Sequence, residues 1–191
     1  MPLTYFRPEH RRSMPVAGLL FLLAVMLSCD SAPRAPALMD TPVFHDRQEG
    51  FRFLVPDGWT QNARANLPPG RLEGESFLVR YRMKTPEMGA MLQIICFDDS
   101  GQTDLAEYHA GPSFRVRRWE AEGPGESIDV NGKQAERFVH QAVIDGRRMT
   151  KETVCFRKGN RIYNFVGLFF SNDDKAREQI RRAVGSVIWQ Q

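Results

Sequence analysis

Gly50-Phe51-Arg52-Phe53-Leu54-Val55-Pro56-Asp57-Gly58-Trp59 is the stretch of this sequence that decides the fold. Its two phenylalanines and its valine alternate with an arginine and a leucine, a period of two that is typical of a strand. Pro56 ends that strand and Asp57-Gly58 forms a tight turn. Trp59 then places a large aromatic side chain at one end of the core. The stretch therefore predicts the opening of a β-rich domain.

The chain after this stretch predicts further strands joined by short turns. Residues 75–83 alternate apolar and polar side chains, and residues 88–97 form a nearly continuous apolar run. Both patterns favour strands. From residue 127 to 170, turns at Asn131-Gly132, Asp145-Gly146 and 158–160 separate further strand-like segments. This second half predicts an antiparallel meander.

Two helices are predicted to cover this sheet. A short helix begins near Thr103-Asp104 and ends near Gly111, and a longer one runs over residues 173–185 with one apolar stripe. The last strand of the meander, residues 161–170, has apolar side chains on both faces, so both faces must be covered. The predicted fold class is therefore α+β, an antiparallel meander with helices on both faces.

The stretch at 50–59, the order of the elements and the closing hairpin, helix and aromatic plug resemble the Mog/PsbP-like families of exported bacterial proteins. The resemblance covers residues 50–189 and implies an α/β/α sandwich. Plant PsbP-like proteins are extrinsic subunits that dock on a photosystem, Mog-type proteins bind a small GTPase, and many bacterial relatives are lipoproteins of unknown role. The resemblance thus implies a protein that is not an enzyme. No binding residue can be assigned from the resemblance, because the shared positions are core and turn positions.

The N-terminus has the parts of an export signal. Three arginines precede an apolar run over residues 16–27, which closes in Met26-Leu27-Ser28-Cys29. The run is shorter than the roughly 20 apolar residues that a membrane-spanning helix needs. We predict residues 1–28 to be a lipoprotein signal peptide and Cys29 to carry acyl chains of the palmitate type. Because Met26 and Leu27 depart from the usual motif, plain secretion and a retained anchor stay open as alternatives.

The rest of the chain divides into a tether and one domain. Residues 29–48 contain several prolines and no hydrophobic period, which predicts a flexible tether, and residues 49–191 suit a single globular domain. The net charge of +3 nearly vanishes when the leader and its arginines are removed. A near-neutral exported domain argues against nucleic acid as a partner. The predicted location is the cell envelope, on a membrane that faces the periplasm or the exterior.

Cys96 and Cys155 are the cysteines that remain after Cys29. In an oxidising compartment they are a candidate disulfide, provided that their strands are neighbours or face one another. Buried free thiols and a functional thiol are the alternatives. The sequence does not choose among these three.

The sequence contains no signature of catalysis or of metal binding. His45, His109 and His140 lack metal-ligand spacing, and no nucleophile elbow or phosphate-binding glycine loop is present. We therefore expect no metal, no cofactor and no catalytic residue.

Arg115, Arg117, Arg118 and Trp119 form the most suggestive candidate surface. Arginines on one side of an extended segment could contact anionic lipid or a protein partner, whereas an edge strand kept soluble by charge explains the same pattern. The sequence thus predicts a non-catalytic envelope lipoprotein that binds or supports another envelope component. A small-ligand-binding protein, or an enzyme without a known motif, is the alternative.

Overall fold

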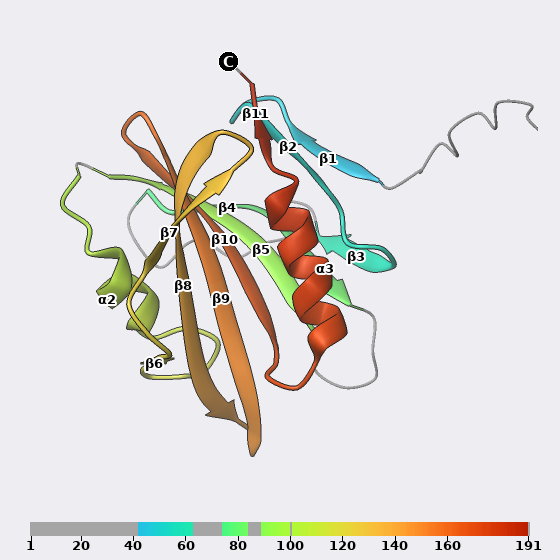
Figure 1. Ribbon diagram of the computed structural model, residues 1–191, viewed down its shortest axis with the longest axis vertical. Coiled ribbons are helices and arrows are strands. Elements are labelled where there is room, and N and C mark those ends of the chain that lie inside the picture. Colours follow the sequence, from blue (N-terminus) through green and yellow to red (C-terminus); the bar gives the residue numbers. More distant parts are fainter. Residues whose placement is uncertain (1–41, 63–73, 84–88, 100, 191) are drawn as a thin grey trace, which may run out of the picture. The chain divides into compact units, whose positions relative to one another are not determined.

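An antiparallel sheet of eight strands forms the body of the structure, a computed structural model that describes residues 42–62, 74–83, 89–99 and 101–190 (Figure 1). The strand order is β3-β4-β5-β10-β9-β8-β6, and β7 also pairs with β8. The strands are β3 Trp59–Asn62, β4 Ser76–Met83, β5 Met91–Asp98, β6 Glu120–Ala121, β7 Glu126–Val130, β8 Lys133–Ile144, β9 Arg147–Lys158 and β10 Arg161–Phe170. The predicted signal peptide and Cys29 lie outside the described residues.

A second, three-stranded sheet has the order β1-β2-β11. Its strands are β1 Val43–Asp46, β2 Phe51–Leu54 and β11 Ile188–Trp189, so it joins the first described residues to the last. Strand β2 is the strand predicted from the opening stretch. Strand β1 lies within residues 29–48, which the sequence predicts to be a tether, and it pairs with β2 from Val43 to Asp46. The end of that segment is therefore a strand.

The central position of β10 explains its apolar faces. It pairs with β5 on one side and with β9 on the other over nearly its whole length. One face carries Tyr163, Phe165 and Phe169, and the other carries Ile162 and Leu168. The prediction that both faces of this strand are covered is confirmed.

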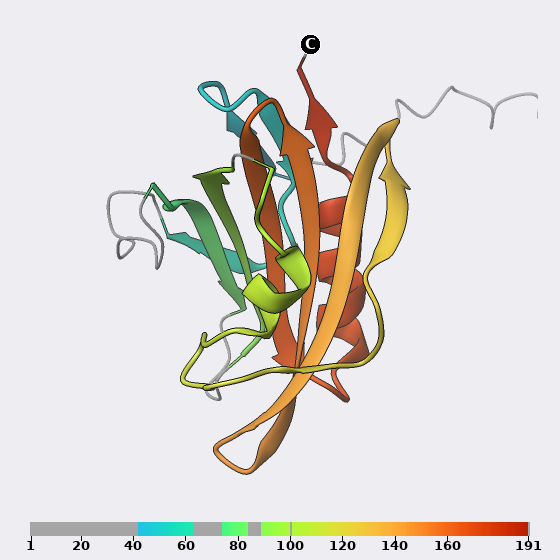
Figure 2. The same ribbon diagram turned by 90° about the vertical axis from the view of Figure 1, so that its left-hand side faces the viewer.

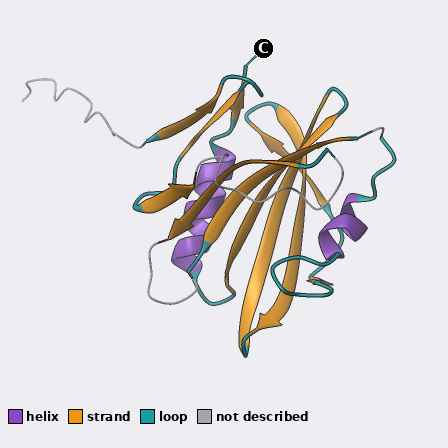
Figure 3. Cartoon of the chain, turned by 180° about the vertical axis from the view of Figure 1, so that it is seen from behind, coloured by secondary structure: helices purple, strands orange, loops and turns teal. Residues whose placement is uncertain are grey.

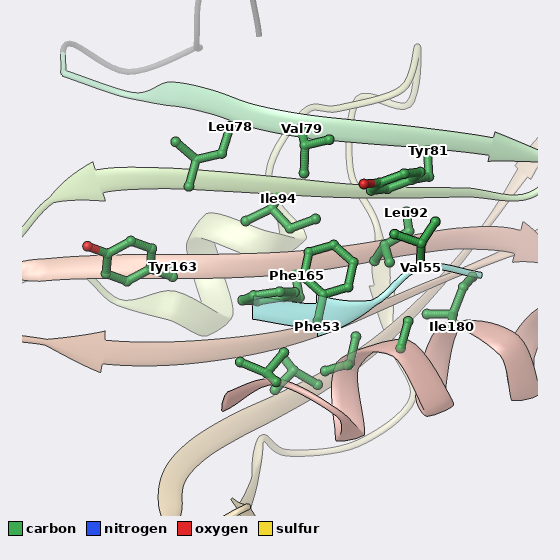
Figure 4. Close-up of a cluster of buried hydrophobic side chains, with 14 of the residues drawn as sticks. Phe53, Val55, Leu78, Val79, Tyr81, Leu92, Ile94, Tyr163, Phe165 and Ile180 are labelled. Carbon is green, nitrogen blue, oxygen red and sulfur yellow. The ribbon is translucent and has the colours of Figure 1, made fainter. Parts of the chain in front are cut away.

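Helix α3, Asp174–Gly185, and the small sheet together cover the first face. Asp173 caps the helix, because its carboxylate accepts a hydrogen bond from the Ala176 amide at 2.9 Å. Figure 4 shows Phe53 of β2 and Phe165 of β10 meeting between the two sheets, with Ile180 of the helix beside them. This face therefore has a mixed cover of helix and strand.

The second face has a thinner cover. Helix α2, Leu105–Ala110, lies across it, and the segment 111–119 continues the cover with little regular structure (Figure 2). Asp104 caps α2, and Gly111 ends it. Figure 3 shows the two helices on opposite faces of the main sheet.

The predicted α/β/α sandwich is wrong. Strands account for 55% of the structure and helices for 14%, and the described residues hold two helices and two sheets. Two physical causes account for this. β1 and β11 pair with the two edges of β2 and form a second sheet that shares the cover of the first face with α3, and Gly111-Pro112 stops α2 after six residues. Within the described ranges, no helix is long and apolar enough to cross a membrane.

Gly167 lets α3 approach the sheet closely. A Cβ atom at this position would lie 2.6 Å from Ile180 Cγ2 and 3.2 Å from Ile180 Cδ1. We expect Gly167→Ala to lower the free energy of unfolding by about 1–3 kcal/mol, because the helix must shift outward. Urea denaturation measures this. Gly123→Ala is the control, since nothing lies within 4 Å of its added Cβ. Equal stability of the two variants would contradict the prediction.

Candidate functional site

A cavity of about 180 Å³ lies between α2 and the second face of the main sheet. Its apolar walls come from distant parts of the chain. They are formed by Phe77 of β4, Ile95 of β5, Tyr108 of α2, Phe114 of the segment after α2, and Val166 of β10. The cavity exists because α2 is short and the irregular segment after it does not fill the space above the sheet.

Arg80 and Gln93 line one side of this cavity from paired positions on β4 and β5. The Arg80 Nε and Nη2 atoms donate to Gln93 Oε1 at 3.2 and 3.0 Å, and the guanidinium lies 5.3 Å from the centre of the Phe77 ring. Burial, and secondarily the charge of Arg82, lowers the pKa of Arg80, but a guanidinium stays protonated in proteins. No ion pair of Arg80 is found in the part of the chain that the structure describes.

Lys151 lines the opposite side from β9, and it is only 2% exposed. Its ammonium group donates to Ser113 Oγ at 3.2 Å and to the backbone oxygen of His109, and it lies 4.5 Å from the centre of the Trp119 ring. These contacts come from the end of α2 and from the segment after it. Lys151 is thus held in place by the same segments that cover the cavity.

Two polar side chains lie on the same face of the sheet without hydrogen-bond partners among the described residues. Both Asn164 side-chain atoms, Oδ1 and Nδ2, and the Oγ1 atom of Thr153 are buried and unpartnered. By strand register Thr153 pairs with Val166, which lines the cavity, and Asn164 pairs with Ile95, which also lines it. Buried polar groups in folded proteins are normally satisfied by protein, ordered water or a ligand. These unpartnered groups lie beside the lining of the cavity, in register with it, and are not themselves part of the lining.

His109 and Cys155 form a buried pair that the sequence did not reveal. The distance from His109 Nε2 to Cys155 Sγ is 3.1 Å, and both side chains are nearly inaccessible. Burial, reinforced by Glu136, raises the pKa of the Cys155 thiol well above its usual value. A nucleophilic cysteine needs the opposite shift, toward the thiolate. The raised pKa keeps the Cys155 thiol protonated, so this pair is a structural contact and not a nucleophile with its base.

Of the three alternatives for Cys96 and Cys155, the structure has buried free thiols, and the candidate disulfide does not form. Cys96 of β5 pairs with Tyr163, whereas Cys155 of β9 pairs with the next residue of β10, Asn164. Consecutive residues of a strand point to opposite faces, so the two thiols lie on opposite sides of the sheet with a strand between them. Strands two apart are separated by roughly 9–10 Å, beyond the Cα spacing of a disulfide.

This geometry predicts the alkylation pattern of the two cysteines. In the native protein both should resist iodoacetamide, because burial excludes the reagent. In guanidinium without a reductant, the peptides that contain Cys96 and Cys155 should each gain one label, as measured by mass spectrometry. A pair of peptides linked by a disulfide would contradict the structure.

The predicted partner surface divides into a buried part and an exposed part. Trp119 is only 1% exposed and belongs to a hydrophobic cluster, so it does not form a surface. Arg118 is exposed and forms a bidentate ion pair with Glu107 of α2 at 2.9 and 3.0 Å. Arg115 and Arg117 are exposed. This segment is a loop that covers the sheet rather than an edge strand.

The described residues contain no group of three or more histidine, cysteine, aspartate or glutamate side chains arranged to hold a metal ion. The site is instead lined by two cations, by the polar side chains of Gln93, Ser113 and His109, and by apolar walls. Its chemistry is that of binding.

No protein-family model matches the chain, and no curated protein matches it. Several solved structures do match the chain. Cyanobacterial PsbP (CyanoP) from Synechocystis sp. PCC 6803 is 14% identical, with a TM-score of 0.56 over 78% of this chain and 92% of that one. The chain has the PsbP-like fold. The resemblance predicted from the opening stretch is confirmed at this level.

Two further structures support the PsbP-like assignment. LpqN of Mycobacterium tuberculosis, a protein involved in cell envelope biogenesis, is 13% identical, with a TM-score of 0.53 over 78% of this chain and 90% of that one. A Bacteroides thetaiotaomicron protein is 10% identical, with a TM-score of 0.50, and the match spans 80% of this chain and half of that one. At these identities the likeness concerns the PsbP-like fold alone.

Proposed function

We propose that this chain is a non-catalytic binding protein of the cell envelope, and that it takes a small ligand into the cavity beneath α2. The observation that carries the proposal is the convergence of Arg80, Gln93 and Lys151 on one partly open cavity with aromatic walls. A small number of placed polar groups within an apolar concavity is the usual composition of a ligand site.

The envelope location is supported by the export signal and by the structural neighbours. Residues 1–28 have the parts of a leader, and Cys29 is placed to receive acyl chains. LpqN, whose fold is similar, is described as involved in cell envelope biogenesis. We extend that location to this chain, with its domain held at a membrane by the lipid on Cys29.

An assembly role is the second candidate, and the exposed arginines of the covering loop favour it. Arg115 and Arg117 are both exposed and could contact an acidic envelope partner. Such a partner should be lost from detergent pull-downs when both are replaced by alanine. If the ligand role alone holds, the double variant should recover the same proteins as the wild type.

Anchoring is tested by replacing the acyl acceptor. Full-length protein should fractionate with membranes, and Cys29→Ser should leave the membrane fraction, because one acylated cysteine supplies the anchor. Cys155→Ser, which changes a buried thiol, is the matched control and should remain with the membranes. Intact mass after proteolysis identifies the acylated peptide. Membrane association of Cys29→Ser equal to that of the wild type would overturn the anchor.

Ligand binding is tested on protein purified from its native host. Small molecules released by denaturation are identified by mass spectrometry for the wild type and for Val166→Phe, whose larger side chain projects into the cavity. Val143→Phe is the control, since Val143 is 67% exposed on the β8–β9 hairpin. We expect a compound that accompanies the wild type and the control but is absent from Val166→Phe. The same compounds in all three samples would contradict the proposal.

A further inference from the structure

We infer that the cavity beneath α2 recognises a small monocarboxylate with an apolar body, a molecule of about the size of benzoate. This inference deepens the proposed function and rests on it. It names the class of ligand from the volume, the charge and the wall composition of the site.

The volume limits the ligand to a small molecule. A cavity of about 180 Å³ is far below the roughly 300–1,000 Å³ of sites for drug-sized compounds. An engineered protein cavity of about 150 Å³ holds benzene. A single ring with one small substituent therefore fits, whereas a nucleotide or a disaccharide does not.

The charge of the lining selects an anion. Arg80 and Lys151 are cationic, and no aspartate or glutamate is among the described residues that line the cavity. Glu75 contacts the lining from outside, since its carboxylate accepts a hydrogen bond from Tyr108 Oη at 3.1 Å. The Arg80 guanidinium uses its Nε and one terminal nitrogen for Gln93, which leaves further N–H donors for a ligand.

A carboxylate suits these donors better than a phosphate does. A guanidinium holds a carboxylate through charge-assisted hydrogen bonds, and an amide such as that of Gln93 can donate to the same oxygens. A dianionic phosphate would bring a second charge and a larger polar surface against the aromatic carbon of Phe77, Tyr108 and Phe114. The aromatic walls instead suit the apolar body of the ligand.

Two unpartnered polar side chains beside the lining are a second, independent observation. Asn164 is fully buried, and both of its amide atoms lack hydrogen-bond partners among the described residues, as does Thr153 Oγ1. Leaving such groups unsatisfied costs about 1–3 kcal/mol each. Both side chains lie on the sheet face below the cavity, in register with its lining residues. Ordered water between these groups and the cavity would satisfy them.

The test uses full-length protein and the pair benzoate and benzamide, which have nearly the same shape but differ in charge. Isothermal titration calorimetry should detect benzoate binding and much weaker benzamide binding. Arg80→Gln should weaken benzoate about tenfold to a hundredfold, which is the usual range for one charge-assisted contact. Arg82→Gln removes an exposed arginine from the same strand and should leave the affinity within about twofold.

The outcomes separate this inference from the proposed function. Equal binding of benzoate and benzamide, both lost in Val166→Phe, would keep the cavity as a ligand site but overturn its selectivity for a carboxylate. Benzoate binding that is unchanged in both Arg80→Gln and Val166→Phe would place the anion elsewhere and overturn the inference. If neither compound binds but native protein carries another small molecule, the proposed function stands without this ligand class.

Discussion

Replacing Phe51 with alanine is expected to lower the free energy of unfolding by about 3–5 kcal/mol. Phe51 is completely buried at the start of β2, where its ring lies 5.2 Å from that of Trp189, 5.6 Å from Phe165 and 6.1 Å from Tyr163. It thus contacts β11 of the small sheet and β10 of the main sheet. Truncation of Phe51 to alanine leaves a void where the two sheets meet, and the neighbouring aromatic rings cannot fill it without moving.

Urea denaturation followed by tryptophan fluorescence and by far-ultraviolet circular dichroism measures this loss. Trp189 lies in the small sheet, and Trp59 and Trp119 contribute to the same fluorescence signal, while circular dichroism reports on the whole fold. Val143→Ala is the control, because Val143 is exposed and its truncation should change stability by less than about 0.5 kcal/mol. A loss below 1 kcal/mol for Phe51→Ala would mean that β2 does not connect the two sheets as described.

The strands of this fold could be predicted well from local patterns. Alternation and turn residues such as Asn131-Gly132 and Asp145-Gly146 placed the meander within a few residues of β7 to β10. Both of these turns need a positive φ, and all four of their residues have one. Because these signals are contained in short segments, they can be read from the sequence without knowledge of the tertiary structure.

The cover of the sheet could not be predicted in the same way. β1 and β11 are short strands that pair with β2 from the two ends of the described chain. β11 pairs with a strand more than a hundred residues before it, and nothing local in residues 188–189 indicates that partner. The pairing of β1 with β2 is close in sequence, but residues 43–46 follow a proline-containing segment without a hydrophobic period. The sequence therefore predicted a tether where β1 lies and an aromatic plug where β11 lies, and it expected helix alone over the face that α3 shares with the small sheet.

The candidate site was missed because its residues carry no short motif. Arg80, Gln93, Lys151 and Asn164 come from four strands, and strand register alone brings them to one face. One signal was available. Residues 149–157 read as a strand within a sheet covered on both sides, yet Lys151 and Thr153 occupy alternate positions of it. Polar side chains that must be buried on one face indicate a site.

The candidate surface shows the opposite error. Arg115, Arg117, Arg118 and Trp119 were grouped because they are close in sequence, and basic residues beside an aromatic one are common at interfaces. In the structure the indole ring turns inward toward Lys151, while Arg118 turns outward to Glu107. Adjacent residues of an extended segment point in opposite directions, so sequence neighbours seldom share a surface.

Protonation of His140 is expected to make the stability of the protein fall as the pH drops below about 6.5. His140 is 2% exposed and pairs with Lys151 across β8 and β9. Burial, and secondarily the charge of Lys151, lowers the pKa of His140 from 6.5 to about 4. The unfolded chain therefore binds a proton at a pH where the folded chain does not. The stabilisation is complete above about pH 6.5 and is lost progressively as the pH falls toward 4.

The difference between these pKa values corresponds to about 3 kcal/mol across that window, as an upper bound. Urea denaturation at pH 7.5, 6, 5 and 4.5 measures it. His140→Gln should reduce the loss between pH 6.5 and 4.5, because glutamine does not titrate, whereas the exposed His45→Gln should retain it. Lys151→Met should also reduce the loss, since removing the neighbouring charge raises the pKa of His140. If His140→Gln follows the wild-type profile at every pH, the buried, neutral imidazole beside Lys151 is excluded.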